Sequence, residues 1–426
     1  MEMQINERAI ALDIILAVLE QGEYSHIVRS AVLEKYEFLD KKQRSFIDRL
    51  SMGTIEQAIL LDYIIEQYSS TKVKKMKPAI RNILRLSVYQ LKFMDSVPAS
   101  AVCNEAVKLA KKRGPKQLSG FVNGVLRNIA RDEKNIEYPN LSVKYSMPEW
   151  IADKLVESYG NETAEGILKA FLSKQPTTIR TNTSLISPEE LKGRLEDEGV
   201  KVTKVDELPY AFIISDFDYI ASLQSFKDGL FYIQDLSSMM VAEAADVREG
   251  DSVIDVCAAP GGKALHVAEL LNGTGHVEAR DLTDDKVSLI SENIKRSNLK
   301  NISAKRWDAT VSDAYSIGKA DVLICDLPCS GIGIIGRKPD IKYNISKEQI
   351  DELAALQRDI LKTVIPYARS GGRIVFSTCT ISREENDSNS DWIRDNFDNL
   401  IEKSRKQYLP TEGKCDGFYI AVYEVK

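Results

Sequence analysis

The second half of the chain alternates short β-branched segments with helical segments, and this alternation constrains the fold more than any other feature. The predicted strands lie within residues 251–377 and read DSVIDV, GHVEA, ISAKR, DVLIC and GRIVFS. Helical patterns cover residues 264–271, 284–297 and 347–369. Strands that alternate with helices form a doubly wound, mostly parallel sheet. We therefore predict an α/β domain over residues 236–426.

Glycines, acidic residues and cysteines gather where these predicted strands end. The first strand runs into CAAPGGK, the next two end near Asp281 and Asp308, and the last two run into DLPCSG and TCT. Ligands bind at the carboxyl ends of the strands in sheets of this kind. Core residues would have no reason to cluster there. We therefore expect the functional site at this edge of the sheet.

The turn CAAPGGK, residues 257–263, is predicted to lie against a ligand, because Gly261 and Gly262 let the backbone approach one closely. It is not a P-loop, since Cys257 stands where that motif has glycine and Ala264 stands where it has Ser or Thr. The G-x-G-x-x-G spacing of a dinucleotide-binding turn is also absent. A nucleoside without a phosphate chain, such as S-adenosylmethionine, fits what remains.

Two aspartates at the ends of the following strands support a nucleoside ligand. A carboxylate can accept hydrogen bonds from both hydroxyls of a ribose, and a second carboxylate can accept one from the amino group of adenine. Asp281 and Asp308 are placed for these two roles. Taken singly, each is more often a helix cap or a turn residue. The ordered series of glycine turn and carboxylates favours the nucleoside.

The six cysteines are not expected to form disulfides or to bind a metal. No basic segment opens the chain, and Glu7, Arg8 and Asp13 interrupt the apolar pattern of its first helix, so we expect a cytoplasmic protein without a signal peptide. No second cysteine pair has zinc-finger spacing. No apolar run approaches the ~18 residues of a membrane span. A free cysteine is by default a small buried hydrophobe.

The first half of the chain has a different organisation. Apolar residues recur at helical spacing through residues 1–131, which predicts an all-α bundle. Residues 132–147 lack clear periodicity and are interpreted as a linker, and residues 148–235 mix helical and strand patterns, which predicts a small α+β module. With 426 residues, the chain is long enough for two or three domains.

Positive charge is concentrated in the predicted helical bundle. Residues 71–134 contain 15 Lys and Arg against 4 Asp and Glu, a balance of +11, which leaves −17 for the rest of a chain of formal net charge −6. A basic block in an acidic protein indicates a nucleic-acid contact. The alternative is a solvated helix face.

Several segments resemble known families. GFVNGVLRNIAR and the preceding helical segments resemble the NusB family of RNA-binding helical domains. Five ordered motifs resemble those of the Fmu/Sun (RsmB) family of RNA cytosine-5 methyltransferases, and they read CAAPGGK, DLPCSGIG, KPDIKY, STCTISREEN and DGFY. This resemblance implies an S-adenosylmethionine-dependent methyltransferase that modifies 16S rRNA, acts as a monomer and needs neither metal nor membrane.

The resemblance also implies domain boundaries. They are a NusB-like RNA-binding domain over residues 1–140, a linker helix with a small α+β RNA-binding module over residues 141–235, and a Rossmann-like class I methyltransferase domain over residues 236–426.

The resemblance further implies roles for individual residues. Cys379 is the implied nucleophile, Cys329 is implied in release of the adduct, and Asp326 is implied to bind the base. The implied cofactor site consists of Cys257, Ala258, Ala259, Pro260, Gly261, Gly262, Lys263, Asp281, Asp308 and Asp326.

Two cysteines suit this reaction because a thiolate that adds to carbon 6 of cytosine makes carbon 5 nucleophilic, and sulfur is also a workable leaving group. Chemistry alone does not decide between Cys329 and Cys379, so the resemblance decides. Cys325 and Cys103 lie in apolar surroundings and are interpreted as core, and Cys415 has no assigned role.

A cytosine-5 methyltransferase that acts on an RNA other than 16S rRNA is an open alternative. Three further functions fit parts of the pattern: a DNA methyltransferase, a non-catalytic RNA-binding factor of the antitermination type, and a small-molecule methyltransferase. The Thr-Cys cysteine and the NusB-like segment disfavour the first. The complete set of reacting residues disfavours the second, and the long N-terminal half disfavours the third. Departures from the family pattern occur at Arg280, Leu327, Lys338 and Arg383, and none of them replaces a reacting group.

Overall fold

The computed structural model describes residues 6–132, 136–412 and 415–426. The chain forms two compact units. The helical unit contains Met1–Ser173 and Ile335–Asn344, and the sheet unit contains Lys174–Ile334 and Ile345–Lys426. Among the described residues, no helix has both the length and the apolar character that crossing a membrane requires.

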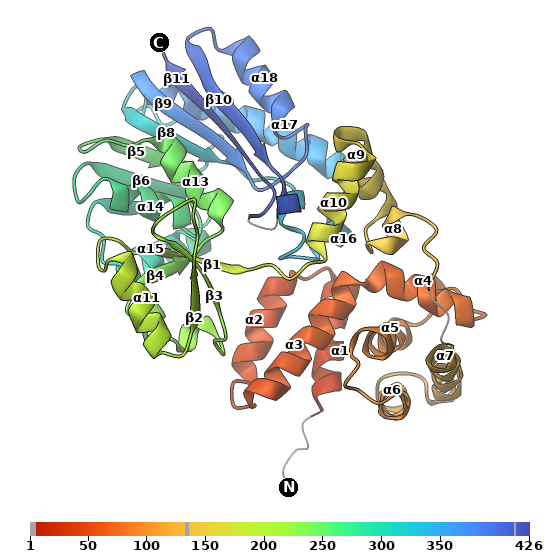
Figure 1. Ribbon diagram of the computed structural model, residues 1–426. Coiled ribbons are helices and arrows are strands. Elements are labelled where there is room, and N and C mark those ends of the chain that lie inside the picture. Colours follow the sequence, from red (N-terminus) through yellow and green to blue (C-terminus); the bar gives the residue numbers. More distant parts are fainter. Residues whose placement is uncertain (1–5, 133–135, 413–414) are drawn as a thin grey trace. The chain divides into compact units, whose positions relative to one another are not determined.

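In the helical unit, the helices of residues 7–131 bury their apolar faces in one core, as the spacing in residues 1–131 predicts. Local signals set the helix ends. Asp40 and Gln43 form a capping box at the start of one helix, and Pro78 occupies the first turn of another. The helices are α1 (Glu7–Gln21), α2 (Ser25–Lys35), α3 (Lys41–Glu56), α4 (Ala58–Tyr68), α5 (Pro78–Phe93), α6 (Ala99–Arg113), α7 (Ser119–Arg131), α8 (Leu141–Lys144), α9 (Glu149–Tyr159), α10 (Asn161–Phe171) and α16 (Ile341–Asn344) (Figure 1).

The prediction that residues 132–147 form a linker is wrong for the second half of this range. Residues 133–135 lie outside the described residues. Ser146 is fully buried, with a φ of 49°. Its hydroxyl oxygen accepts hydrogen bonds from the backbone N–H groups of Ile59 (3.1 Å) and Leu60 (3.4 Å) in the first turn of α4. Residues 140–147 are therefore packed into the helical unit.

The sheet unit contains a small antiparallel sheet of order β2-β3-β1-β4. It packs against α11 (Pro188–Asp197) and α12 (Gln224–Lys227) around a core of its own. Its strands are β1 (Thr177–Thr181), β2 (Lys201–Lys204), β3 (Ala211–Ser215) and β4 (Phe231–Ile233). The predicted α+β module is confirmed for its sheet, although the sequence did not indicate β4. Its predicted start at residue 148 is wrong, because residues 148–173 belong to the helical unit.

The large sheet has the order β10-β11-β9-β8-β5-β6-β7. Strands β5 to β9 are parallel, and β10 and β11 are antiparallel additions at one edge. The chain proceeds outward from β5 to β7 on one side and from β8 to β9 on the other, so the strand order reverses between β5 and β8. The strands are β5 (Ser252–Asp255), β6 (His276–Asp281), β7 (Ile302–Arg306), β8 (Ala320–Asp326), β9 (Ala368–Thr378), β10 (Leu400–Tyr408) and β11 (Phe418–Val425).

Helices cover both faces of this sheet, as the doubly wound prediction requires (Figure 1). Val253 of β5 packs in one core cluster, and the next residue, Ile254, packs in the other, because successive strand side chains point to opposite faces. The first cluster includes residues of α13 (Leu236–Ala245), α14 (Gly262–Leu270) and α15 (Asp284–Ser297), and the second includes residues of α17 (Lys347–Val364) and α18 (Asp387–Asn396). The predicted fold class is confirmed.

One local prediction is corrected. The helix predicted over residues 347–369 ends at Val364, because Pro366 cannot continue it, and a 3-10 turn then leads directly into β9. Arg280 is buried on the face of β6 opposite its neighbours, where its guanidinium donates to Asp313 (3.0 Å) and Ser316 (2.6 Å). The departure from the family pattern at Arg280 is therefore compensated by an internal ion pair.

Candidate active site

The carboxyl ends of β5, β6, β8 and β9 bring most of the predicted site residues into contact. The turn at residues 257–263 follows β5 and leads into α14. Backbone hydrogen bonds join it to its neighbours, from Val256 N to Ile324 O (3.1 Å) and from Ala258 N to Arg280 O (2.8 Å). Gly261 has a φ of 105°, a conformation that other residues rarely adopt, so glycine is required at this position.

Asp281 is held against this turn. One carboxylate oxygen accepts from Ala259 N (2.9 Å), and the other accepts from Leu282 N (2.8 Å) and contacts Lys286 Nζ (3.0 Å). The side chain is almost fully buried. Two parts of the predicted cofactor site, the turn and the first carboxylate, thus lie in direct contact.

Asp308 is joined to Asp281 only through the backbone, by a hydrogen bond from Trp307 N to Asp281 O (2.9 Å). Its own exposed carboxylate accepts from the hydroxyl (2.7 Å) and the backbone N–H (2.9 Å) of Thr310. These hydrogen bonds lower the pKa of Asp308. The role of Asp308 in binding adenine stays a prediction, and its present role is that of a turn residue.

Lys263 and Asp326 form an ion pair at the centre of this edge, with 2.7 Å between Lys263 Nζ and Asp326 Oδ2. The hydroxyl of Ser377, near the end of β9, donates to Asp326 Oδ1 (2.8 Å). Burial would lower the pKa of Lys263, but the carboxylates of Asp326 and Asp255 outweigh it and the pKa is raised. Asp326 therefore presents an oriented carboxylate next to a fixed positive charge.

Asp255, the last residue of β5, was missed by the sequence analysis. It is fully buried, and its Oδ2 has no hydrogen-bond partner among the described residues. Burial, with the negative charge of Asp326 as a second cause, raises the pKa of Asp255 to about 8. The signal that could have identified it is its place at the carboxyl end of the first strand, immediately before the glycine turn.

Cys329 and Cys379 lie side by side, with 3.3 Å between their sulfur atoms. They come from the loops that follow β8 and β9, which are neighbouring strands. The hydrogen bond with Cys379, together with burial, raises the pKa of Cys329 well above its ordinary range. Either sulfur can be the donor in this contact, so the two thiols can share one proton.

The other cysteines near this edge of the sheet are poor candidates for the nucleophile. Cys325 is fully buried in β8, and burial raises its pKa well above the ordinary value. Burial and the carboxylates of Asp255 and Asp281 likewise raise the pKa of Cys257. A thiol that stays protonated is a poor nucleophile. Cys415 lies against a small apolar cluster that includes Leu208.

Glu385, which the sequence analysis also missed, joins the two cysteine loops. Its carboxylate accepts from Ser330 N (2.7 Å) and from the Ser330 hydroxyl, next to Cys329. The same hydroxyl lies 2.8 Å from that of Thr380, next to Cys379. Glu385 is fully buried, and burial raises its pKa. A buried carboxylate that uses both oxygens in this way fixes the two loops relative to each other.

Comparison with known proteins agrees with this arrangement. The family model described as 16S rRNA methyltransferase RsmB/F matches residues 242–424, the NusB family model matches residues 5–131, and a model of the ferredoxin-like domain of RsmF/B-like methyltransferases matches residues 147–218.

Curated relatives align with most or all of the chain. The chain is 38% identical over 387 residues to the probable ribosomal RNA small subunit methyltransferase B of Bacillus subtilis, which covers 89% of this chain and 86% of the relative. It is 30% identical to the ribosomal RNA small subunit methyltransferase B of Proteus mirabilis, with both chains covered completely. The crystal structure of a methyltransferase homologue from Pyrococcus horikoshii has a TM-score of 0.60 and 26% identity, and covers 68% of this chain and 100% of the homologue. The chain therefore belongs to the RsmB/F family of 16S rRNA methyltransferases.

Proposed function

We propose that this protein transfers a methyl group from S-adenosylmethionine to carbon 5 of a cytosine in 16S rRNA, through a covalent adduct between Cys379 and carbon 6. The observation that carries the proposal is the pair of thiols 3.3 Å apart, beside a carboxylate that is fixed by a lysine. Methylation at a nitrogen or at a ribose hydroxyl has no use for two adjacent thiols, because those acceptors are already nucleophilic.

The residues at the carboxyl edge fit the cofactor. The buried carboxylate of Asp281 is adjacent to a turn whose glycine has a φ of 105°, and the unpartnered oxygen of Asp255 is a further buried acceptor. When bound, S-adenosylmethionine supplies the electrophilic methyl group. Asp281 would accept from the ribose hydroxyls, and Gly261 would allow the backbone to lie close to the nucleoside.

In this mechanism Asp326 orients the base. Its carboxylate is held by Lys263 and Ser377 and accepts from the exocyclic amine of cytosine. The Cys379 thiolate forms a bond to carbon 6, and the electron pair of the carbon 5–carbon 6 double bond makes carbon 5 nucleophilic. After methylation, Cys329, once it has released its own proton to solvent, accepts the proton from carbon 5, the double bond re-forms, and the Cys379 thiolate is expelled. The target base must be unpaired or flipped out of a stem.

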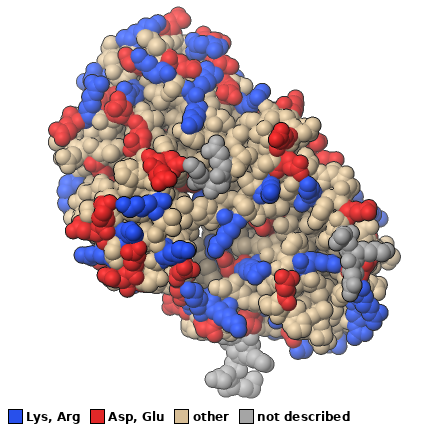
Figure 2. Space-filling model, viewed as in Figure 1, with Lys and Arg blue, Asp and Glu red and all other residues tan. Residues whose placement is uncertain are grey.

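The helical unit offers features suited to RNA. Lys74, Lys75, Lys111 and Lys112 are exposed, whereas Arg113 pairs with Asp13 at 2.6 Å. On the face drawn in Figure 2, basic side chains are interspersed with acidic ones, so the net charge of −6 does not prevent local basic areas.

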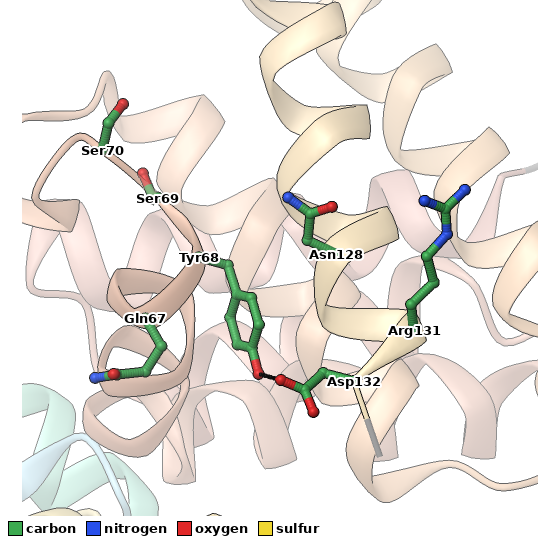
Figure 3. Close-up of a pocket in the computed structure, with 7 residues that line it drawn as sticks. All are labelled: Gln67, Tyr68, Ser69, Ser70, Asn128, Arg131 and Asp132. Atoms are coloured by element: carbon green, nitrogen blue, oxygen red, sulfur yellow. Dashed lines mark hydrogen bonds between the residues drawn. The ribbon is translucent and has the colours of Figure 1, made fainter. Parts of the chain in front are cut away.

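A hollow of about 720 Å³ opens at the ends of α4 and α7 (Figure 3). Its lining consists of polar side chains and one tyrosine, whose hydroxyl donates to Asp132 (2.7 Å). The lining residues are Gln67, Tyr68, Ser69, Ser70, Asn128, Arg131 and Asp132. Amide, hydroxyl and guanidinium groups are those that bind unpaired nucleotides.

Replacing Lys74, Lys75, Lys111 and Lys112 together with glutamine should flatten the dependence of RNA affinity on salt. Each lost phosphate contact lowers the slope of log K against log salt by about 0.7 for single-stranded RNA. Filter binding of a 16S rRNA fragment between low and moderate salt measures this slope. An unchanged slope would favour a solvated helix face that does not contact RNA.

The variant Asp281→Ala should weaken the binding of S-adenosylmethionine. A charge-assisted hydrogen bond is worth about 1.5–3 kcal/mol, which corresponds to roughly ten- to a hundredfold in Kd. Titration calorimetry measures the affinity directly. Asp285→Ala, which removes an exposed carboxylate from the first turn of α15, is the matched control. Equal affinity of the two variants would remove Asp281 from the site.

The experiment that tests the proposed function is a methylation assay with tritiated cofactor on 16S rRNA, small ribosomal subunits and a DNA of the same sequence. The proposal expects label in cytosine of the RNA, recovered as 5-methylcytosine after nuclease digestion. Label in DNA alone, or in a different nucleoside, would contradict it.

A further inference from the structure

The segment Ile335–Asn344 belongs to the helical unit, although the residues on both sides of it belong to the sheet unit. It begins six residues after Cys329 and contains the KPDIKY motif. None of the roles proposed above uses this segment. Its side chains are nevertheless among the most deeply buried polar groups of the helical unit.

Lys342 is the main anchor of this segment. Its side chain is only 2% exposed, and its Nζ donates to the backbone oxygens of Glu56 (2.7 Å) and Ser146 (2.6 Å). Lysine is almost never fully buried unless its ammonium group is partnered. Glu56 is the last residue of α3, so its carbonyl has no partner within the helix and is free to accept from the Lys342 amine. Burial lowers the pKa of Lys342 to about 7.

The neighbours of Lys342 add further anchors. The hydroxyl of Tyr343 donates to Ile55 O (2.7 Å), also in the last turn of α3. The buried hydroxyl of Ser25, at the start of α2, donates to the buried carboxylate of Asp340. Three separate parts of the helical unit, namely the end of α3, the start of α2 and Ser146, therefore hold this segment through hydrogen bonds, and such bonds are costly to break where they are buried.

In the sheet unit, the chain just before this segment is packed against the cysteine loops. Gly333 O accepts from Gly417 N (2.9 Å). A Cβ atom at Gly333 would lie 2.0 Å from Gly417 O and 2.9 Å from Cys379 O, so the two backbones are in direct contact. Gly333 is four residues after Cys329 and two before Ile335, and this short connection leaves little slack.

We infer that Lys342 is a positioning residue for the methyl-transfer reaction: it anchors the segment that follows the Cys329 loop, and this anchor, together with Glu385, restrains that loop. The inference rests on the proposed function. Contacts made in the helical unit should then affect the rate of the chemical step. An RNA-binding module attached by a free linker would not affect that rate.

The test compares Lys342→Met, which keeps the length of the side chain but removes its ammonium, with Lys347→Met, which removes an exposed lysine from the first turn of α17. The single-turnover rate of methylation, the Kd for RNA and the Kd for cofactor are measured for each. We expect Lys342→Met to lower the single-turnover rate at least tenfold while both Kd values stay within about twofold of wild type. Lys347→Met should match wild type in all three.

A second readout does not depend on methylation. The rate at which iodoacetamide alkylates Cys329 and Cys379, followed by peptide mass spectrometry, reports how firmly the thiol loops are held. We expect faster alkylation of both thiols in Lys342→Met and an unchanged rate in Lys347→Met. If wild type proved inactive on 16S rRNA, the proposed function would fail, while this readout would still test the anchor.

Two milder variants keep the test decisive if Lys342→Met does not fold. Tyr343→Phe removes one hydroxyl at α3, and Ser25→Ala removes another at α2, far from Cys329 in sequence. Each should slow single-turnover methylation and speed alkylation to a smaller degree. Weaker RNA binding with an unchanged single-turnover rate and unchanged alkylation in the folded variants would overturn the inference.

Discussion

Replacing Cys379 with alanine should reduce single-turnover methylation to background and should give no covalent protein–RNA complex. Without the Cys379 thiolate to add at carbon 6, carbon 5 of cytosine remains a poor nucleophile. We expect a loss of at least about a thousandfold, equal to about 4 kcal/mol in the activation barrier. Rapid-quench assays with labelled cofactor measure the rate, and denaturing electrophoresis detects the complex.

Cys103→Ala provides the control for this experiment. Cys103 is a buried thiol of α6 in the core of the helical unit, so the variant tests the loss of a cysteine without touching the proposed site. Its rate should stay within a few-fold of wild type, and its Kd values for RNA and cofactor should be unchanged. A Cys379→Ala enzyme that retained a substantial rate would remove the covalent step from the mechanism.

Replacing Cys329 with alanine should have the opposite effect on the adduct. Attack by Cys379 and methylation remain possible, whereas loss of the carbon 5 proton and expulsion of the thiolate are slowed, so the intermediate accumulates. We expect a protein–RNA complex that survives denaturing electrophoresis and whose yield increases when cofactor is present. Turnover should fall to near background, an effect as large as that of Cys379→Ala.

Peptide mapping of this complex separates the two roles. The cross-linked peptide should contain Cys379, and the attached nucleotide should carry the methyl group. A complex that formed with Cys379→Ala and not with Cys329→Ala would reverse the assignment. If both variants turned over normally, the 3.3 Å separation of the sulfurs would be a packing contact without a chemical role.

The parallel sheet and its functional edge could be predicted because they depend on local patterns. β-branched strands such as that of Val253 and Ile254 alternate with amphipathic helices, and the glycine turn and the carboxylates follow them in order. The antiparallel hairpin of β10 and β11 was not predicted, since Lys406 and other polar residues interrupt its alternation. The burial of Ser146 could not be predicted either, because its partners at Ile59 and Leu60 are more than eighty residues away.

The sequence predicted those residues of the candidate site that belong to a motif at the end of a strand. Cys329 and Cys379 are fifty residues apart, and only the pairing of β8 with β9 brings their sulfurs together. Asp255 and Glu385 were missed because their significance depends on burial and on their partners. Lys342 read as an ordinary charged residue of a motif, and its role depends on the distant end of α3. Long-range polar contacts of this kind leave no periodicity in the sequence.

The most direct test of the account is a map of 5-methylcytosine in 16S rRNA from a strain that lacks this protein, made by bisulfite sequencing. If Cys379 directs methyl transfer to carbon 5, a cytosine protected from conversion in the parent strain becomes fully converted in the deletion strain. Protection should return when the wild-type chain is supplied, and it should not return with Cys379→Ala. An unchanged map, or a deletion strain that lost a methyl group from a base nitrogen or a ribose hydroxyl instead, would contradict methyl transfer to carbon 5 through Cys379.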